Sequence, residues 1–282
     1  MIIERKSTLF QIVSDRLKCK FKVTVKQILF NIKYRQFFKN IKFQKNTKNG
    51  KKLLVIGNGI SSLKLEGLNI DRSNIEVMVL NGYYRTKLAK SVKPNYYLIS
   101  DPNYFVSSKV TSHIRDNNLK QYCSEACAKI ILPIQYYSGD DLEKLGFCDI
   151  YDPYSNFTVD ILKPYSHLSM SAYKALRVGL YLGYDEIGII GLDNDYIKCY
   201  EVDSNNRISY CVPHTDREQR IFVDEDQYED GFGQNIGALI YHDSFLFIDL
   251  DDFPTTKFVN LNREGLITSF KKVDPATWCM CV

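Results

Sequence analysis

The chain has 282 residues, enough to bury a substantial core, and its 45% hydrophobic and 25% charged residues are ordinary for a soluble globular protein. Charged residues interrupt every long apolar stretch, so we expect neither a transmembrane helix of about 18 apolar residues nor a secretory signal peptide. We therefore expect a cytoplasmic protein.

The net charge of +4 conceals a strong asymmetry along the chain. Residues 1–52 contain 15 Lys/Arg and 2 acidic residues, whereas the remainder contains 22 Lys/Arg and 31 acidic residues. Apolar residues within 1–50 recur every three or four positions, which predicts amphipathic helices with basic faces. We expect this basic helical arm, residues 1–50, to lie on an anionic membrane surface at the inner face of the cytoplasmic membrane.

The composition of the arm also fits two other uses. The arm could pack against the rest of the chain with its lysines in solvent, or it could bind nucleic acid. Because no recognised nucleic-acid module accompanies it, we expect no nucleic-acid partner.

Beyond a turn at residues 46–50, short apolar runs alternate with helical patterns. The predicted strands are residues 52–56, 75–80, 96–100, 128–133, 186–190 and 258–262. One helix is expected around Lys109–Asn117, and a clearer one begins with Ser171 as N-cap and ends at Gly183. This alternation predicts an α/β fold, a Rossmann-like, mainly parallel sheet flanked by helices, in which residues 51–282 form one catalytic domain.

Polar residues follow several of these strands, at the sheet edge where open parallel sheets bind their ligands. The glycine loop Gly57-Asn58-Gly59 would let the backbone approach a phosphate or ribose closely. It is neither the dinucleotide fingerprint nor a Walker A loop. The other strand-end residues are Ser61, Asn81, Asp101 and Asp193 to Asp195.

The order of these motifs resembles the bacterial lipooligosaccharide sialyltransferases and related proteins of polysaccharide gene clusters. The resemblance spans about Leu53 to Lys272 and is strongest in separated blocks. These blocks are Val55–Ser61, Leu80–Tyr84, Ser100–Pro102, Ser171–Asp193 and Phe258–Asn262.

This resemblance implies a glycosyltransferase that moves a nonulosonic or related sugar acid from a CMP-sugar donor to a glycan or glycolipid acceptor at the cell surface. It implies a metal-independent single displacement that requires no cofactor. Ser171 would contact the sugar carboxylate or the nearby phosphate. The nucleotide would be bound by Gly57, Asn58, Gly59, Ser61, Asn81 and Asp101.

The resemblance also implies the catalytic residues. Tyr196 and Tyr200 would bind the leaving phosphate, and His214 would be the general base for the acceptor hydroxyl. Leu168 stands where the family has an arginine, which leaves the donor sugar open. The acidic segment at about 199–236 is expected to form a lid-like loop.

Other functions remain open at this stage. Asp193 and Asp195 form an Asp-x-Asp pair of the kind that holds Mg²⁺ or Mn²⁺ in UDP-sugar transferases. Pterin pyrophosphokinases of related fold would use ATP and Mg²⁺, and a scaffold would bind a nucleotide or a membrane without turnover. We prefer the metal-free route because a CMP-sugar releases a monophosphate. The oligomeric state, including a homo-oligomer, is left open.

Overall fold

The structure is a computed structural model that describes residues 9–101, 104–105, 114, 116–137, 144–152, 154, 157–165, 171–193, 200–202, 208–210, 254, 257–265, 267 and 269–280. The α-helices are α1 (Leu9–Phe43), α2 (Asn117–Glu125), α3 (Ser171–Leu182) and α5 (Pro275–Cys279). The strands are β1 (Lys52–Ile56), β2 (Ile75–Leu80), β3 (Tyr96–Leu98), β4 (Lys129–Pro133), β5 (Gly146–Phe147), β6 (Glu186–Ile190), β7 (Tyr200–Val202), β8 (Ile208–Tyr210), β9 (Phe258–Asn260) and β10 (Lys271–Lys272). Short 3₁₀ helices are η1 (Ile60–Leu65), η2 (Asn81–Arg85), η3 (Lys87–Lys90) and η5 (Ile134–Tyr136).

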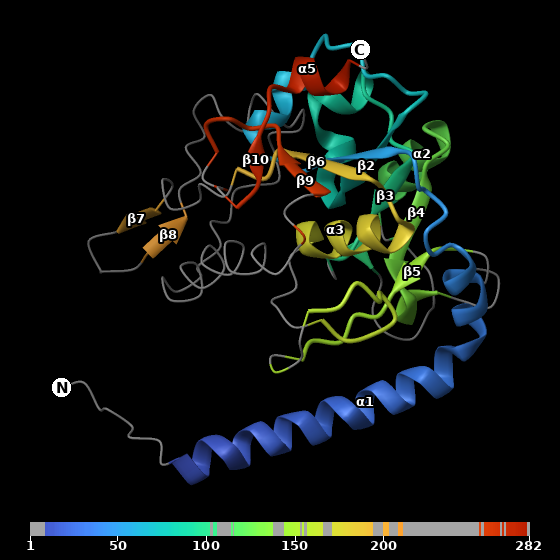
Figure 1. Cartoon of the computed structure of the whole chain (residues 1–282), viewed down its shortest axis with the longest axis vertical. Helices are drawn as coiled ribbons and strands as arrows, with labels where there is room; N and C mark the ends of the chain where they lie inside the picture. Colours follow the sequence, from blue (N-terminus) through green and yellow to red (C-terminus); the bar gives the residue numbers. More distant parts are fainter. Residues whose placement is uncertain are drawn as a thin grey trace.

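Within the described part of the chain, eight strands form one sheet in the order β10-β9-β6-β1-β2-β3-β4-β5 (Figure 1). Every neighbouring pair is parallel. The chain moves outward from β1 through β5 and then returns to the other side of β1 with β6, so the topological switch point lies between β1 and β6. The predicted Rossmann-like α/β fold is confirmed.

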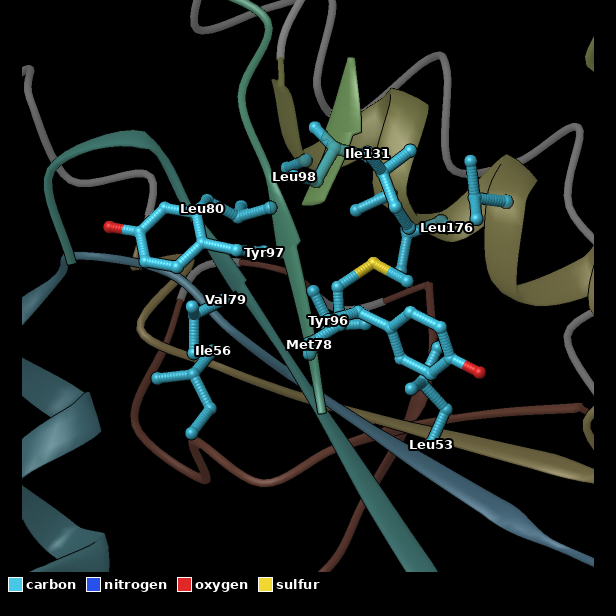
Figure 2. Packing of buried hydrophobic residues seen from close by; sticks show 14 of the residues in the cluster. Leu53, Ile56, Met78, Val79, Leu80, Tyr96, Tyr97, Leu98, Ile131 and Leu176 are labelled. Atoms are coloured by element: carbon cyan, nitrogen blue, oxygen red, sulfur yellow. The ribbon is translucent and has the colours of Figure 1, made fainter. Parts of the chain in front are cut away.

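The central strands are buried on both faces, which explains why their residues are mostly apolar. All six residues of β2 are buried, as are the last four of β1. Tyr96 and Tyr97 are consecutive in β3, and their rings lie on opposite sides of the strand (Figure 2). Aromatic side chains from one short strand therefore enter the core on both faces of the sheet.

Two glycines allow helices to lie close to the sheet. A Cβ atom at Gly179 of α3 would lie 2.8 Å from side-chain atoms of Leu53 and Ile187, so α3 packs directly on β1 and β6. A Cβ atom at Gly188 would lie 2.8 Å from the ring of Trp278 in α5. Because Ile187 and Gly188 are consecutive in β6, α3 and α5 cover opposite faces.

In the described part of the N-terminal arm, Leu9–Phe43 form a single helix of 35 residues, α1, rather than several helices. Figure 1 shows it extended along one side of the molecule. The turn after α1 lies against the end of α3, where the backbone amides of Asn46 and Lys48 donate to the carbonyls of Tyr181 (3.0 Å) and Leu182 (2.9 Å). Among the described residues, no helix is both long and apolar enough to span a membrane.

A partly buried ion pair joins this turn to the amino end of β2. Lys48 Nζ lies 2.7 Å from Glu76 Oε1, and the Tyr184 hydroxyl donates to the other carboxylate oxygen. Burial alone would raise the pKa of Glu76, but the hydrogen bonds from Lys48 and Tyr184 hold it below its ordinary value. The acidic side chain of an otherwise apolar strand thus has two donors.

One expected helix is misplaced. The helix expected around Lys109–Asn117 is wrong where the structure describes it, because Ile114 forms an isolated bridge with Phe105 and α2 only begins at Asn117. Asp116 caps α2, accepting from the amides of Asn118 and Leu119. The predicted strands agree with β1, β2, β3, β4, β6 and β9 to within two residues at their ends. The strands β5, β7, β8 and β10 were not predicted, and β7 and β8 lie within the segment at about 199–236 that was expected to form a loop.

Candidate functional site

The carboxyl ends of the parallel strands lie along one edge of the sheet, and the loops that follow β1, β2, β3 and β6 meet there. The loops after β1 and β6 touch each other directly. Gly57 N donates to Ile190 O at 2.8 Å, and Gly59 N donates to Gly191 O at 2.8 Å. The two loops therefore continue the β1–β6 pairing beyond the strands.

Close packing explains why glycines occupy positions 57 and 59 in the loop after β1. A Cβ atom at Gly57 would lie 2.3 Å from the carbonyl oxygen of Gly191, and one at Gly59 would lie 2.5 Å from an Asp193 carboxylate oxygen. Gly191 itself has φ +72°, which favours glycine. Close contact between two loops is thus enough to require Gly57 and Gly59, and contact with a nucleotide stays a prediction.

Ser61 and Asp193 form the buried junction between these loops. The Ser61 amide donates to Asp193 Oδ2 at 3.0 Å, and the Ser61 hydroxyl donates to Asp193 Oδ1. Asn262 Nδ2 donates to the same Oδ1 at 2.9 Å, which adds the loop after β9. Both carboxylate oxygens of Asp193 therefore accept hydrogen bonds from protein groups, and the observed role of Asp193 is structural.

A second cluster joins the ends of β2 and β3 to the start of α3. Asn81 Nδ2 donates to Ser171 Oγ at 2.7 Å, and Asn81 Oδ1 accepts from the Ser100 amide at 3.1 Å. The hydroxyls of Ser100 and Ser171 lie 2.5 Å apart. The Asp101 amide also approaches Asn81 Oδ1, at 3.5 Å. Asn81, Asp101 and Ser171, predicted separately from three parts of the chain, are thus brought together, and Ser100 joins them.

Asn81 has an unusual backbone. Its φ is +39°, a left-handed conformation that asparagine tolerates better than most residues. The Tyr97 hydroxyl donates to the Asn81 carbonyl at 2.5 Å and accepts from the Tyr84 amide at 2.9 Å. Tyr84 in turn donates to the Asp116 carboxylate.

The Tyr97 phenol donates to Asn81, and the Tyr84 phenol donates to Asp116. Burial raises the pKa of Tyr97 well above its ordinary value, and burial followed by the hydrogen bond to Asp116 raises that of Tyr84. A phenol is protonated at neutral pH even at its ordinary pKa, so both hydroxyls can donate. Sequence reasoning gave neither residue a role, although Tyr84 stands in the block Leu80–Tyr84.

Asn58 lies beside this cluster. Its Nδ2 is 3.5 Å from the carbonyl oxygen of Leu80, the residue that precedes Asn81. Its Oδ1 is buried and has no hydrogen-bond partner in the described part of the chain. Because a buried acceptor without a donor is costly, this oxygen is suited to accept from a ligand.

The first turns of α3 are anchored by buried charge, which sequence reasoning also missed. Lys174 is buried, and its Nζ lies 2.6 Å from Asp149 Oδ1. Arg177 donates to the backbone carbonyls of Thr158 (2.9 Å) and Asp160 (2.7 Å). Lys174 and Arg177 share the helix face opposite Ala172 and Leu176, and both faces are buried. These contacts hold segments 144–152 and 157–165 against α3 and so fix the position of Ser171.

Several predicted residues lie outside what the structure describes. Tyr196, His214 and Asp195 are among them, as is most of the acidic segment at about 199–236. Tyr200 begins β7, which pairs with β8 in a separate antiparallel sheet, but only its backbone is described. Over the described ranges, no group of three or more His, Cys, Asp or Glu side chains is placed to hold a metal ion.

Comparison with known proteins gives a weak similarity of fold. No family model matches the chain, and no curated protein does. One similar solved structure is the sialyltransferase CstII from Campylobacter jejuni in complex with cytidine-5'-monophosphate, with 14% identity, a TM-score of 0.34, and 80% of this chain and 86% of that chain covered. Another is the same enzyme with CMP-3FNeuAc, with 14% identity, a TM-score of 0.39, and 82% and 89% covered. A similarity at this level does not establish the activity of this chain.

Proposed function

We propose that this protein is a glycosyltransferase that takes a sugar from a CMP-sugar donor. The observation that carries the proposal is the convergence of Asn58, Asn81 and Ser171 at the carboxyl edge of a parallel sheet. The resemblance in sequence assigned these same three residues to the donor.

The chemistry of this cluster suits a nucleotide. Asn58, Asn81, Ser100 and Ser171 offer amide and hydroxyl groups that can pair with the edge of a base or with ribose hydroxyls. Asn58 Oδ1, buried without a partner among the described residues, would accept an N–H or O–H from the ligand. The hydrogen bonds around Asn81 hold the cluster in place before a ligand arrives.

The proposed reaction is a single displacement. His214 takes the proton of the acceptor hydroxyl, and the oxygen attacks the anomeric carbon of the donor sugar. The bond between that carbon and the phosphate oxygen breaks, CMP leaves, and Tyr196 and Tyr200 donate hydrogen bonds to the departing phosphate. The configuration at the anomeric carbon is inverted. The roles of these three residues rest on the resemblance alone.

The donor sugar is proposed to be a nonulosonic or related acid, and the acceptor a glycan or glycolipid. The metal-free route is preferred to an Asp-x-Asp metal site. Both oxygens of Asp193 accept hydrogen bonds from Ser61 and Asn262, so a metal would have to displace donors that join three loops.

Release of nucleotide from candidate donors tests the proposal. The full chain is incubated with CMP-, UDP- and ATP-type donors, with and without EDTA, and the freed nucleotide is measured. We expect CMP release that EDTA does not change. Magnesium-dependent AMP release would indicate a pyrophosphokinase instead. UDP release that EDTA prevents would indicate a metal-dependent UDP-sugar transferase. No nucleotide release from any donor would indicate a non-catalytic binding protein.

A further inference from the structure

Helix α1 carries a second apolar face that the rest of the molecule leaves exposed. The exposed fractions on this outward face are 63% for Leu17, 72% for Phe21, 52% for Ile28 and 67% for Ile32. With about 100° of rotation per residue, these four side chains fall within an arc of about 60°. They form one continuous stripe of exposed apolar surface, which is uncommon in a globular protein.

The opposite face of the helix is the one that packs against the sheet domain. Val23, Phe30, Phe37 and Ile41 are buried there. Gln27 Nε2 donates to the Leu162 carbonyl at 3.2 Å, and the Tyr181 hydroxyl donates to the Ile41 carbonyl at 3.0 Å. These contacts fix the rotation of α1, so the outward face cannot be buried by turning the helix.

Positive charge surrounds the outward face. The helix contains nine Lys/Arg, all exposed, and one acid, Asp15, which pairs with Lys18. Lys18, Lys20 and Lys22 flank the apolar stripe, and Arg35 and Lys39 continue it toward the end of the helix. An apolar centre with a basic border is complementary to a surface whose interior is apolar and whose headgroups are acidic.

We propose that the outward face of α1 docks in the plane of a membrane rich in anionic lipids. Leu17, Phe21, Ile28 and Ile32 enter the boundary between headgroups and acyl chains, and the flanking lysines contact lipid phosphates. The helix lies on the surface and does not cross it, in keeping with the lack of a described helix apolar enough to span. The inference does not depend on the sugar-transfer chemistry.

Two other occupants fit the face less well. A second copy of α1 would cover the apolar stripe, but it would bring the cations on and beside the stripe, among them Lys18, Lys20, Arg35 and Lys39, close to the same cations of the first copy. Nucleic acid would satisfy the cations but would leave four large apolar side chains against a phosphate backbone. Of these three occupants, only an anionic bilayer is complementary both to the apolar stripe of α1 and to the basic residues beside it.

Vesicle flotation with the full chain tests the proposal. Wild-type protein is mixed with vesicles of neutral phosphatidylcholine, alone or with about one third phosphatidylglycerol, and the bound fraction is measured at low and high salt. The test variant is Phe21→Gln/Ile32→Gln, and the matched control is Met280→Gln, an apolar residue 55% exposed outside α1. Lys18→Gln/Lys22→Gln tests the charged border.

We expect wild type and Met280→Gln to float with anionic vesicles and much less with neutral ones. The apolar double variant should bind at least tenfold more weakly, and the lysine double variant should lose binding most strongly at low salt. All variants should keep the wild-type circular dichroism spectrum, because the changed side chains are exposed. The proposal is overturned if wild type stays with the unbound fraction, if Phe21→Gln/Ile32→Gln floats like wild type, or if this variant instead disrupts a homodimer.

Discussion

The side-chain amide of Asn81, at the end of β2, donates a 2.7 Å hydrogen bond to the hydroxyl of Ser171, the first residue of α3. The two residues are 90 positions apart in sequence. Their contact joins the end of a strand to the start of the helix that covers the sheet, and Ser100 completes the cluster.

Replacing Asn81 should weaken nucleotide binding. Asn81→Gly keeps the positive φ accessible but removes the amide that holds Ser171 and the Ser100 backbone. We expect the Kd for CMP, measured by isothermal titration calorimetry, to rise at least tenfold, since a buried polar group left without its partner costs about 1–3 kcal/mol. Asn69→Gly, an exposed position, is the control. Unchanged CMP affinity in Asn81→Gly would remove Asn81 from the donor site.

Replacing His214 should abolish transfer while leaving CMP binding nearly intact. A general base acts on the acceptor hydroxyl and not on the nucleotide, so His214→Ala should lower kcat by about 10²–10⁴-fold. His242→Ala provides a matched substitution elsewhere in the chain. Turnover at the wild-type rate in His214→Ala would show that another group takes the proton.

Replacing Asp193 should destabilise the fold. In Asp193→Ala, the Ser61 amide, the Ser61 hydroxyl and Asn262 Nδ2 lose their buried acceptor. We expect the free energy of unfolding, measured by urea denaturation, to fall by about 3 kcal/mol. Asp185→Ala, which removes one exposed hydrogen bond from Gly50, should cost much less. A stable Asp193→Ala protein that has lost a metal-dependent activity would favour the Asp-x-Asp metal site instead.

The Glu76 ion pair should make stability depend on pH. The folded pKa of Glu76 is below its ordinary value, so its contribution is present above the unfolded pKa of about 4.3 and is lost as the pH falls through the folded pKa. Glu76→Gln should therefore lower the free energy of unfolding by about 1–3 kcal/mol at pH 7, with a smaller difference at pH 3. Glu125→Gln, at an exposed helix position, should show no such pH dependence. An equal loss at both pH values would mean that the charge of Glu76 does not stabilise the fold.

Much of the sheet was predictable because a strand buried on both faces is mostly apolar, and an exception such as Glu76 in β2 needs hydrogen-bond partners. The runs at 52–56, 75–80 and 186–190 became β1, β2 and β6 without change. The end of α3 was also predictable from neighbouring residues, because Gly183 follows the helix with φ +87°, a conformation that favours glycine. β5 was not predictable, because two residues carry no periodic pattern.

The reason for the glycines in the loop after β1 could not be predicted from neighbouring residues. Gly57 and Gly59 have the appearance of a phosphate-binding turn, yet the atoms nearest to them belong to Gly191 and Asp193, more than 130 residues away. The same holds for Lys174 and Arg177, whose helix face is buried by segments 144–152 and 157–165. No rule of spacing within a short window reveals such partners.

The sequence by itself determined the parallel α/β sheet, the polar residues at its strand ends and the basic character of the N-terminal segment, because strand burial, turn conformation and charge are properties of neighbouring residues. Only the tertiary structure decided which strand-end residues meet. It joined Asn58, Asn81, Ser100 and Ser171 in one cluster and placed Ser61 and Asp193 in a separate structural junction. It also decided which apolar face of α1 is buried and which is exposed. These outcomes depend on contacts between distant segments, and the order of strands in the sheet sets those contacts.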